Sequence, residues 1–117
     1  MIVGRISEDG VPVVMLTIAG REWPGIIDTG FNSDLELPVA LRAAVRAQHH
    51  GRVYSTLAGG HEIREEAYLV QFPFDGEIVA AEATFVAGQE ILIGTRLLRN
   101  HRLEIDFPAK TVRLTRV

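Results

Sequence analysis

Residues 24–30, with the sequence Pro-Gly-Ile-Ile-Asp-Thr-Gly, constrain this chain more than any other segment. The two isoleucines are typical of a buried strand, and Asp28 follows them directly. Thr29 can bind its hydroxyl to nearby backbone, while Gly30 can adopt a positive φ and let another backbone approach closely. Such a segment sends one carboxylate into a sharp turn and holds it still. We therefore interpret Asp28 as the central functional residue.

A β-hairpin is predicted to carry Asp28 to its loop. Residues 11–18 and 22–27 are dominated by aliphatic side chains, and the intervening Ala-Gly-Arg is typical of a turn. Much later, residues 91–98 have the sequence Ile-Leu-Ile-Gly-Thr-Arg-Leu-Leu, which predicts a buried strand that runs into Gly94. The chain thus contains two apolar strands that end close to a glycine.

These motifs occur in an order that resembles the retropepsin-like aspartic proteases. The family carries an Asp-Thr-Gly triplet after an apolar strand, a glycine-bearing hairpin downstream, and a distal apolar-apolar-Gly motif before a short helix. The resemblance covers roughly residues 11–107 and is to single-domain members of bacterial type. It implies a mainly β fold, a closed β-barrel of the acid protease type with one or two short helices. We expect one domain over residues 1–117.

The resemblance also assigns a substrate-covering flap. Residues 52–56 and 61–72 predict a long hairpin around the turn Leu-Ala-Gly-Gly. In the family this hairpin closes over bound peptide, which makes Ala58, Gly59 and Gly60 candidate substrate-binding residues. A plain surface turn is the alternative. Four charged residues of the second arm are expected on its solvated face: Glu62, Arg64, Glu65 and Glu66.

The residues next to the triplet are candidates for the substrate cleft. Phe31 directly follows the triplet, where many family members have a small residue, and it would narrow the neighbouring subsite. Asn32 could hydrogen-bond a peptide backbone, although asparagine is also an ordinary turn residue. By resemblance, Thr29 and Gly30 support the catalytic loop, and Gly94 packs behind it.

Hydrolysis of a peptide bond by carboxylates needs both a base and an acid. The chain has one Asp-Thr-Gly triplet, and Asp9, Asp75 and Asp106 lie outside it. Asp28 must therefore meet its counterpart from a second copy, which a two-fold homodimer provides. The terminal segments 1–6 and 111–117 predict strands that pair either between two subunits or within one.

Two helices are expected. Residues 38–48 begin with a proline and continue with good helix formers, and residues 95–100 predict a short second helix. His49 and His50 would then lie at the C-terminus of the first helix, where their charge suits the helix dipole. A metal site at this pair is the sharper alternative, but no carboxylate lies at a convincing spacing.

Composition narrows the function classes. The net charge of −3 gives no basic surface for nucleic acid, and there are no cysteines for disulfides, thiolate metal sites or a thiol nucleophile. No stretch approaches the roughly 20 apolar residues of a membrane span. We expect a cytoplasmic protein that uses neither a metal nor another cofactor and binds neither nucleic acid nor membrane.

The leading hypothesis is an aspartic endopeptidase, a homodimer that hydrolyses peptide bonds with water activated between two Asp28 carboxylates. A second hypothesis keeps the retropepsin-like dimer but makes it a catalytically inactive module for peptide binding or dimerisation, as Phe31 would permit. A third is a small β-barrel for an unrelated ligand, in which Asp28 only caps backbone donors. Fold alone does not decide among these functions.

Overall fold

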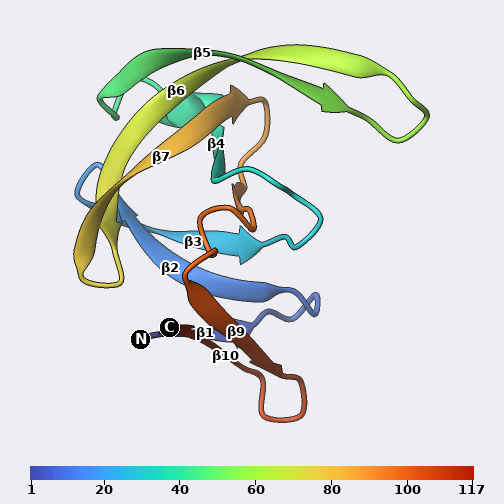
Figure 1. The fold of residues 1–117 in the computed structure, drawn as a ribbon. Coiled ribbons are helices and arrows are strands. Elements are labelled where there is room, and N and C mark those ends of the chain that lie inside the picture. Colours follow the sequence, from blue (N-terminus) through green and yellow to red (C-terminus); the bar gives the residue numbers. More distant parts are fainter.

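The computed structural model describes residues 1–117, apart from the side chain of Ser55. Over these residues the chain forms ten β-strands and one short 3-10 helix, η1 (Figure 1). The elements are β1 (Ile2–Ile6), β2 (Pro12–Ile18), β3 (Arg21–Ile27), β4 (Leu35–Pro38), η1 (Val39–Leu41), β5 (Ala47–Thr56), β6 (Glu62–Phe74), β7 (Glu77–Val86), β8 (Ile91–Ile93), β9 (His101–Asp106) and β10 (Thr111–Arg116). The prediction of a mainly β protein is confirmed.

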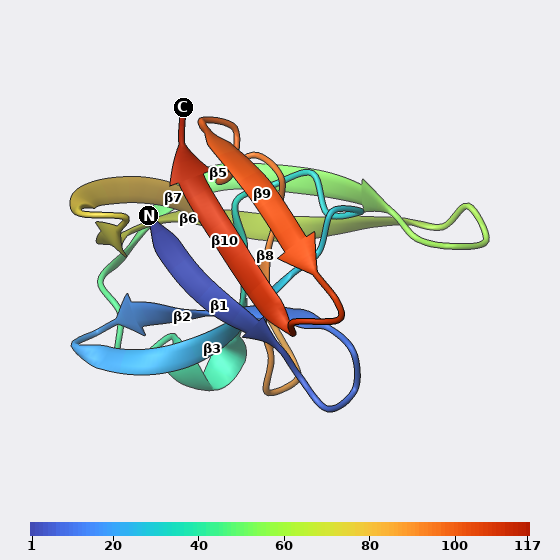
Figure 2. The same cartoon turned by 90° about the horizontal axis from the view of Figure 1, so that it is seen from below.

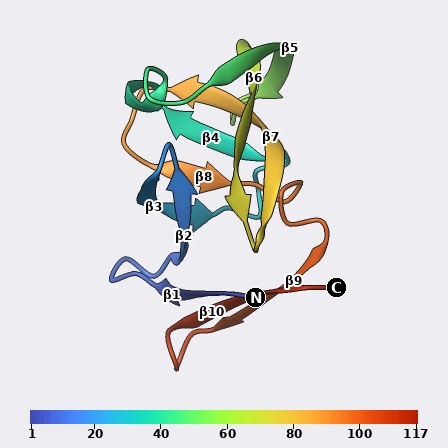
Figure 3. The same cartoon turned by 90° about the vertical axis from the view of Figure 1, so that its left-hand side faces the viewer.

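All ten strands belong to one sheet, in the order β5-β6-β7-β4-β8-β3-β2-β1-β10-β9. Neighbouring strands are antiparallel except for two parallel pairs, β3 with β8 and β4 with β7. The sheet is strongly curled, with β5 to β7 at one end of the molecule and the terminal strands at the other (Figure 3). Within the described chain no pairing joins the two edge strands, β5 and β9, so the closed barrel stays a prediction.

The core is built by period-two alternation along the central strands. Leu35 and Leu37 of β4 are completely buried, and they pack with Ile91 and Ile93 of the neighbouring β8. Because successive side chains of a strand point to opposite faces, Glu36 between the two leucines is turned away from this core. The strand that packs the core thus also presents a carboxylate on its other face.

The hairpin of β5 and β6 projects beyond the rest of the molecule (Figures 1 and 2). From Glu62 to Ala67, β6 pairs only with β5, whereas from Tyr68 onward it also pairs with β7. The register of β5 shifts between His49 and Gly51, opposite the point where pairing with β7 begins. The projecting part is therefore a two-stranded ribbon, joined to the sheet at a β-bulge.

The helix predicted over residues 38–48 is wrong. Only η1 is helical, turns follow it, and β5 already begins at Ala47. Pairing of Ala47 with Val70 on β6 extends the sheet through residues whose own preference is helical. An isolated helix of this length is marginal in water, so tertiary pairing overrides local propensity here.

Two further helix expectations fail for related reasons. His49 lies in β5 and not at a helix end. Its Nε2 is 2.9 Å from Oε2 of Glu66 on β6. Residues 95–100 form successive turns, with the amide of Leu98 donating to the carbonyl of Thr95 at 3.1 Å.

No helix in the described part of the chain is long and apolar enough to cross a lipid bilayer.

The terminal strands pair within one chain, which is one of the two arrangements expected. β1 lies between β2 and β10, and its Ile2 is opposite Leu114. β9 pairs with β10 on one side and forms an edge of the sheet on the other.

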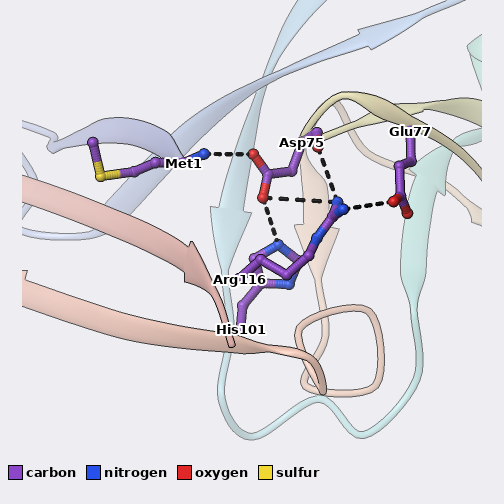
Figure 4. A network of polar contacts seen from close by, with 5 residues as sticks. All are labelled: Met1, Asp75, Glu77, His101 and Arg116. Atoms are coloured by element: carbon purple, nitrogen blue, oxygen red, sulfur yellow. Dashed lines mark hydrogen bonds and ion pairs between the residues drawn. The ribbon is translucent and has the colours of Figure 1, made fainter.

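A buried carboxylate ties both terminal segments to the β6–β7 turn (Figure 4). Oδ1 of Asp75 accepts from the α-amino group of Met1 at 2.7 Å, and Oδ2 lies 3.0 Å from Nε2 of His101. Arg116 donates to the carbonyl oxygen of Asp75 at 2.9 Å and pairs with Glu77 at 2.7 Å. The hydrogen bond from the α-amino group, followed by that from His101, holds the pKa of Asp75 below its ordinary value.

Candidate active site

Asp28 sits on a tight loop at the end of β3. Its amide donates to the carbonyl of Ile93 at 2.9 Å, and its carbonyl accepts from the amide of Phe31 at 3.1 Å. Its Oδ1 accepts from the amide of Gly30 at 2.9 Å. The carboxylate is half-buried, so it is fixed in position and remains accessible.

The two apolar motifs of the sequence lie side by side. β3 and β8 run parallel, with Gly25 opposite Ile91 and Ile27 opposite Ile93. A Cβ at Gly25 would lie 2.7 Å from Cδ1 of Ile93, so a larger residue there would require the end of the Ile93 side chain to shift. The parallel pair brings Asp28 and Gly94 to the same end of the sheet.

Gly94 lies directly against the loop that follows Asp28. Its amide donates to the carbonyl of Asp34 at 3.0 Å, and the amide of Thr95 donates to the carbonyl of Phe31 at 2.9 Å. A Cβ at position 94 would overlap the carbonyl oxygen of Ser33 and lie 2.8 Å from that of Phe31. Only glycine allows the two backbones to approach this closely.

Gly30 serves the loop in a different way from the one predicted. Its φ is not in the left-handed region, so the loop does not use the positive φ that glycine can adopt. A Cβ there would meet Oδ1 of Asp28 at 3.3 Å, and glycine therefore keeps space beside the carboxylate. Thr29 is exposed on the same loop.

Asp34 is a buried residue that the sequence analysis did not single out. Its side chain is 7% exposed, and Oδ2 accepts from the amide of Glu82 at 2.8 Å. Oδ1 is 4.0 Å from Nη1 of Arg99. Its position just before an apolar strand is typical of a turn aspartate, which gave no separate signal of burial.

A cleft of about 640 Å³ opens between the loop that follows Asp28 and the β5–β6 hairpin. The loop, β4, the hairpin, β7 and the turns after β8 all line it, through Gly30, Phe31, Asn32, Ser33, Glu36, Val53, Tyr54, Thr56, Leu57, Ile63, Glu65, Glu82, Thr84 and Arg96. The predicted cleft residues Phe31 and Asn32 are among them. Ala58, Gly59 and Gly60 lie outside the cleft at the exposed hairpin tip, where the two glycines have φ values of 98° and 87°.

The cleft also contains carboxylates that the sequence analysis missed or misplaced. Glu65 was expected on a solvated face, but it is half-buried and lines the cleft. The alternation of Ile63, Glu65 and Ala67 on one face of β6 was the available signal. Burial, then the charge of Glu65, then that of Asp28, raises the pKa of Glu36 above its ordinary 4.5.

The third carboxylate, Glu82, has cationic neighbours. Its Oε1 is 3.7 Å from Nη1 of Arg96, and its Oε2 is 3.6 Å from Nε2 of His50. The hydroxyl of Ser33 donates to it at 3.5 Å. These contacts connect the floor of the cleft to the turns that follow Gly94.

Three solved structures with similar folds are described as proteases. A retropepsin-like aspartic protease from Rickettsia conorii matches with a TM-score of 0.61 and 15% identity, over 96% of this chain and 87% of its own. The chain has the retropepsin-like fold.

Two viral enzymes share the retropepsin-like fold with this chain. The protease of EIAV, solved with an inhibitor, gives a TM-score of 0.60 and 14% identity over 80% of this chain and 89% of its own. The Simian Foamy Virus (mac) protease gives a TM-score of 0.58 and 18% identity over 74% of this chain and 91% of its own. No protein-family model and no curated protein sequence matches the chain. At these identities the likeness establishes the fold, and the activity has to be argued from the site.

Proposed function

We propose that this chain is one subunit of a homodimeric aspartic endopeptidase, with Asp28 as its catalytic residue. The observation that carries the proposal is the fixed, accessible carboxylate of Asp28, held by the Gly30 amide on a loop of the retropepsin-like fold. The cleft beside this loop has a volume of about 640 Å³, within the range of roughly 300–1,000 Å³ that is usual for ligand pockets.

The second carboxylate comes from a second copy of the chain. Asp34, the aspartate nearest to the loop in sequence, has one oxygen bound to the Glu82 amide and is buried. Asp75 is held in the network with the terminal segments. A two-fold axis next to the loop instead brings Asp28 against its own symmetry mate.

The proposed chemistry follows from two carboxylates in close contact. They cannot both ionise when they are about 3 Å apart, so the pair shares one proton. The ionised member takes a proton from a water molecule, which attacks the peptide carbonyl, while the protonated member donates to the carbonyl oxygen. The tetrahedral intermediate collapses as the leaving nitrogen is protonated, and no covalent enzyme adduct forms.

The supporting residues have distinct roles in this proposal. Thr29 braces the dyad across the dimer, Gly30 leaves room for substrate backbone, and Gly94 supports the loop from behind. Phe31 and Asn32 contact the peptide, and the hairpin with Ala58, Gly59 and Gly60 at its tip closes over it as a flap. The proposed enzyme is cytoplasmic.

The second candidate function is a retropepsin-like dimer that binds peptide without cutting it. The observation that favours it is Phe31, a half-buried aromatic side chain in the cleft directly after the triplet. Its bulk would obstruct the approach of a peptide bond to the dyad.

Cleavage of an unbiased peptide library between pH 4 and pH 7 tests the proposal. Wild type and Asp28→Asn are compared after sedimentation shows that both are dimers. Cleavage by wild type alone, blocked by a statine-type transition-state mimic, supports the endopeptidase. A folded wild-type dimer without cleavage rejects it, and recovery of cleavage in Phe31→Ala would identify Phe31 as the cause.

A further inference from the structure

The lining of the cleft divides into an apolar part and an acidic part. Apolar surface comes from the flap hairpin and from the residue after the triplet: Val53, Tyr54, Leu57, Ile63 and Phe31. An extended peptide in this cleft would therefore pack aliphatic side-chain atoms against the hairpin. What the end of such a side chain meets depends on the polar residues of the same cleft.

Two carboxylates enter the cleft from separate elements. Glu36 belongs to β4, where it lies opposite Thr84 of β7, another cleft residue. Glu65 belongs to the hairpin strand β6, opposite Val53. One acid thus comes from the body of the sheet and one from the flap, so their charges face a common space.

Neither of these two acids is neutralised within the described residues. The ion pairs found there include no partner for Glu36 or Glu65. Burial raises the pKa of Glu36 most, and the charges of Glu65 and then Asp28 raise it further. A cation placed between Glu36 and Glu65 would relieve the repulsion between their charges.

The remaining charges of the cleft are already matched. Glu82 has Arg96 and His50 as neighbours at 3.7 and 3.6 Å. Arg96 is therefore already paired with Glu82, and its side chain is 53% exposed. The unmatched charge of the cleft is consequently negative, and it is concentrated at Glu36 and Glu65.

We propose that the cleft selects a peptide with a lysine or arginine side chain, whose cationic end binds between Glu36 and Glu65. Lysine and arginine suit both parts of the lining, since their methylene stems pack on apolar surface while the charged end reaches polar groups. The inference rests on the proposed function for the presence of a peptide in the cleft. It adds one cationic position to the side-chain specificity of the proposed enzyme.

The test compares three matched peptides. An octapeptide cleaved or bound by wild type is chosen from an unbiased library, and the position with the strongest side-chain preference is made lysine, norleucine or glutamate. Binding is measured by fluorescence anisotropy at two salt concentrations, and kcat/KM is measured where cleavage occurs. We expect lysine to be preferred over norleucine by about tenfold, the factor that corresponds to about 1.4 kcal/mol, and glutamate to be disfavoured.

The variant Glu36→Gln/Glu65→Gln should reduce the ratio of lysine to norleucine to near one. Glu62→Gln/Glu104→Gln is the control, because it changes net charge equally at two exposed positions and should keep the wild-type ratio. Thermal unfolding of both variants shows whether they are folded.

The outcomes separate this inference from the endopeptidase proposal. Cleavage without a lysine preference, or with a preference that survives the Glu36/Glu65 double change, overturns the inference and leaves the endopeptidase standing. Lysine-selective binding without cleavage supports the inference and rejects the endopeptidase. A folded dimer that neither cleaves nor binds peptide overturns both the inference and the endopeptidase proposal.

Discussion

The amide of Gly94 donates to the carbonyl oxygen of Asp34 at 3.0 Å, and the side chain of Asp34 accepts the amide of Glu82 at 2.8 Å. Through these two hydrogen bonds, one buried aspartate connects the turn after β8 with β7. The segment that follows Asp28 is therefore held by hydrogen bonds from two elements that are distant in sequence.

Replacing Gly94 by alanine should destabilise the protein more than replacing Gly30. The new Cβ at position 94 would overlap a carbonyl oxygen of the loop, and forced overpacking costs about 1–3 kcal/mol in the free energy of unfolding. At Gly30 the Cβ would meet only Oδ1 of Asp28, at 3.3 Å, and we expect less than about 1 kcal/mol there. Urea unfolding followed by circular dichroism measures both. Equal losses would show that Gly94 does not depend on close backbone approach.

Removing the side chain of Asp34 should leave the Glu82 amide without its acceptor. Asp34→Ala is expected to cost about 1–3 kcal/mol in the free energy of unfolding, the penalty of an unsatisfied buried donor. Asp34→Asn keeps an acceptor oxygen and should cost less. Hydrogen exchange at the Glu82 amide provides the local readout, and unchanged protection in Asp34→Ala would contradict this role.

Asp75 should make folding sensitive to acid. Its pKa is lowered in the folded state by the α-amino group of Met1 and by His101. Because the folded pKa lies below the ordinary 3.8, the stabilisation is complete above that value and is lost as pH falls through the folded pKa. Asp75→Asn should therefore flatten the decline of Tm below about pH 4.

The matched control for this acid dependence is Asp9→Asn. Asp9 lies in an exposed turn between β1 and β2, away from the network of Figure 4. Its replacement should leave the decline of Tm at acidic pH as in wild type. If both variants change this decline equally, the Asp75 network is not the cause of the acid sensitivity.

Glu36 should have the opposite effect on stability. Burial and the charges of Glu65 and Asp28 raise its pKa, so the folded protein binds this proton more tightly than the unfolded chain. Stability is then lost as pH rises through the ordinary 4.5 toward the folded pKa, and stays lower above it. Glu36→Gln should raise Tm at pH 7 and have little effect below pH 4.

Glu104→Gln provides the comparison for Glu36→Gln, because Glu104 is exposed on the edge strand β9. A rise in Tm at pH 7 that occurs only in Glu36→Gln would show that the destabilisation comes from the carboxylates of the cleft. A lower Tm for Glu36→Gln at pH 7 would contradict the repulsion inferred among the three carboxylates.

The sequence predicted best where local pattern and tertiary structure agree. The apolar strand before Asp28, the strand before Gly94 and the hairpin after residue 51 were all expected, and all are present. Their strong period and clear glycine turns left few alternatives. The parallel contact of β3 with β8 was not derivable from either strand alone, because pairing depends on the path of the whole chain.

The failures occurred where burial is decided by partners distant in sequence. Residues 38–48 have good helix formers, yet Ala47 and the residues after it form a strand because they pair with β6. The sequence around Asp34 is typical of a turn, whereas its burial depends on a hydrogen bond from the amide of Glu82, 48 residues later in the chain. Glu65 was grouped with its charged neighbours, although alternation along β6 already separated it from Arg64 and Glu66.

The β-bulge between His49 and Gly51 separates the projecting β5–β6 ribbon from the rest of the sheet. Outside it, the ribbon of β5 and β6 has no third strand, whereas inside it β7 holds β6 through Tyr68 and beyond. The whole ribbon can swing about this bulge without breaking a single ladder to β7, and the bulge already supplies a local bend. A rotation of the ribbon at Gly51 would therefore be amplified toward its tip, while the pairing of β6 with β7 stays intact.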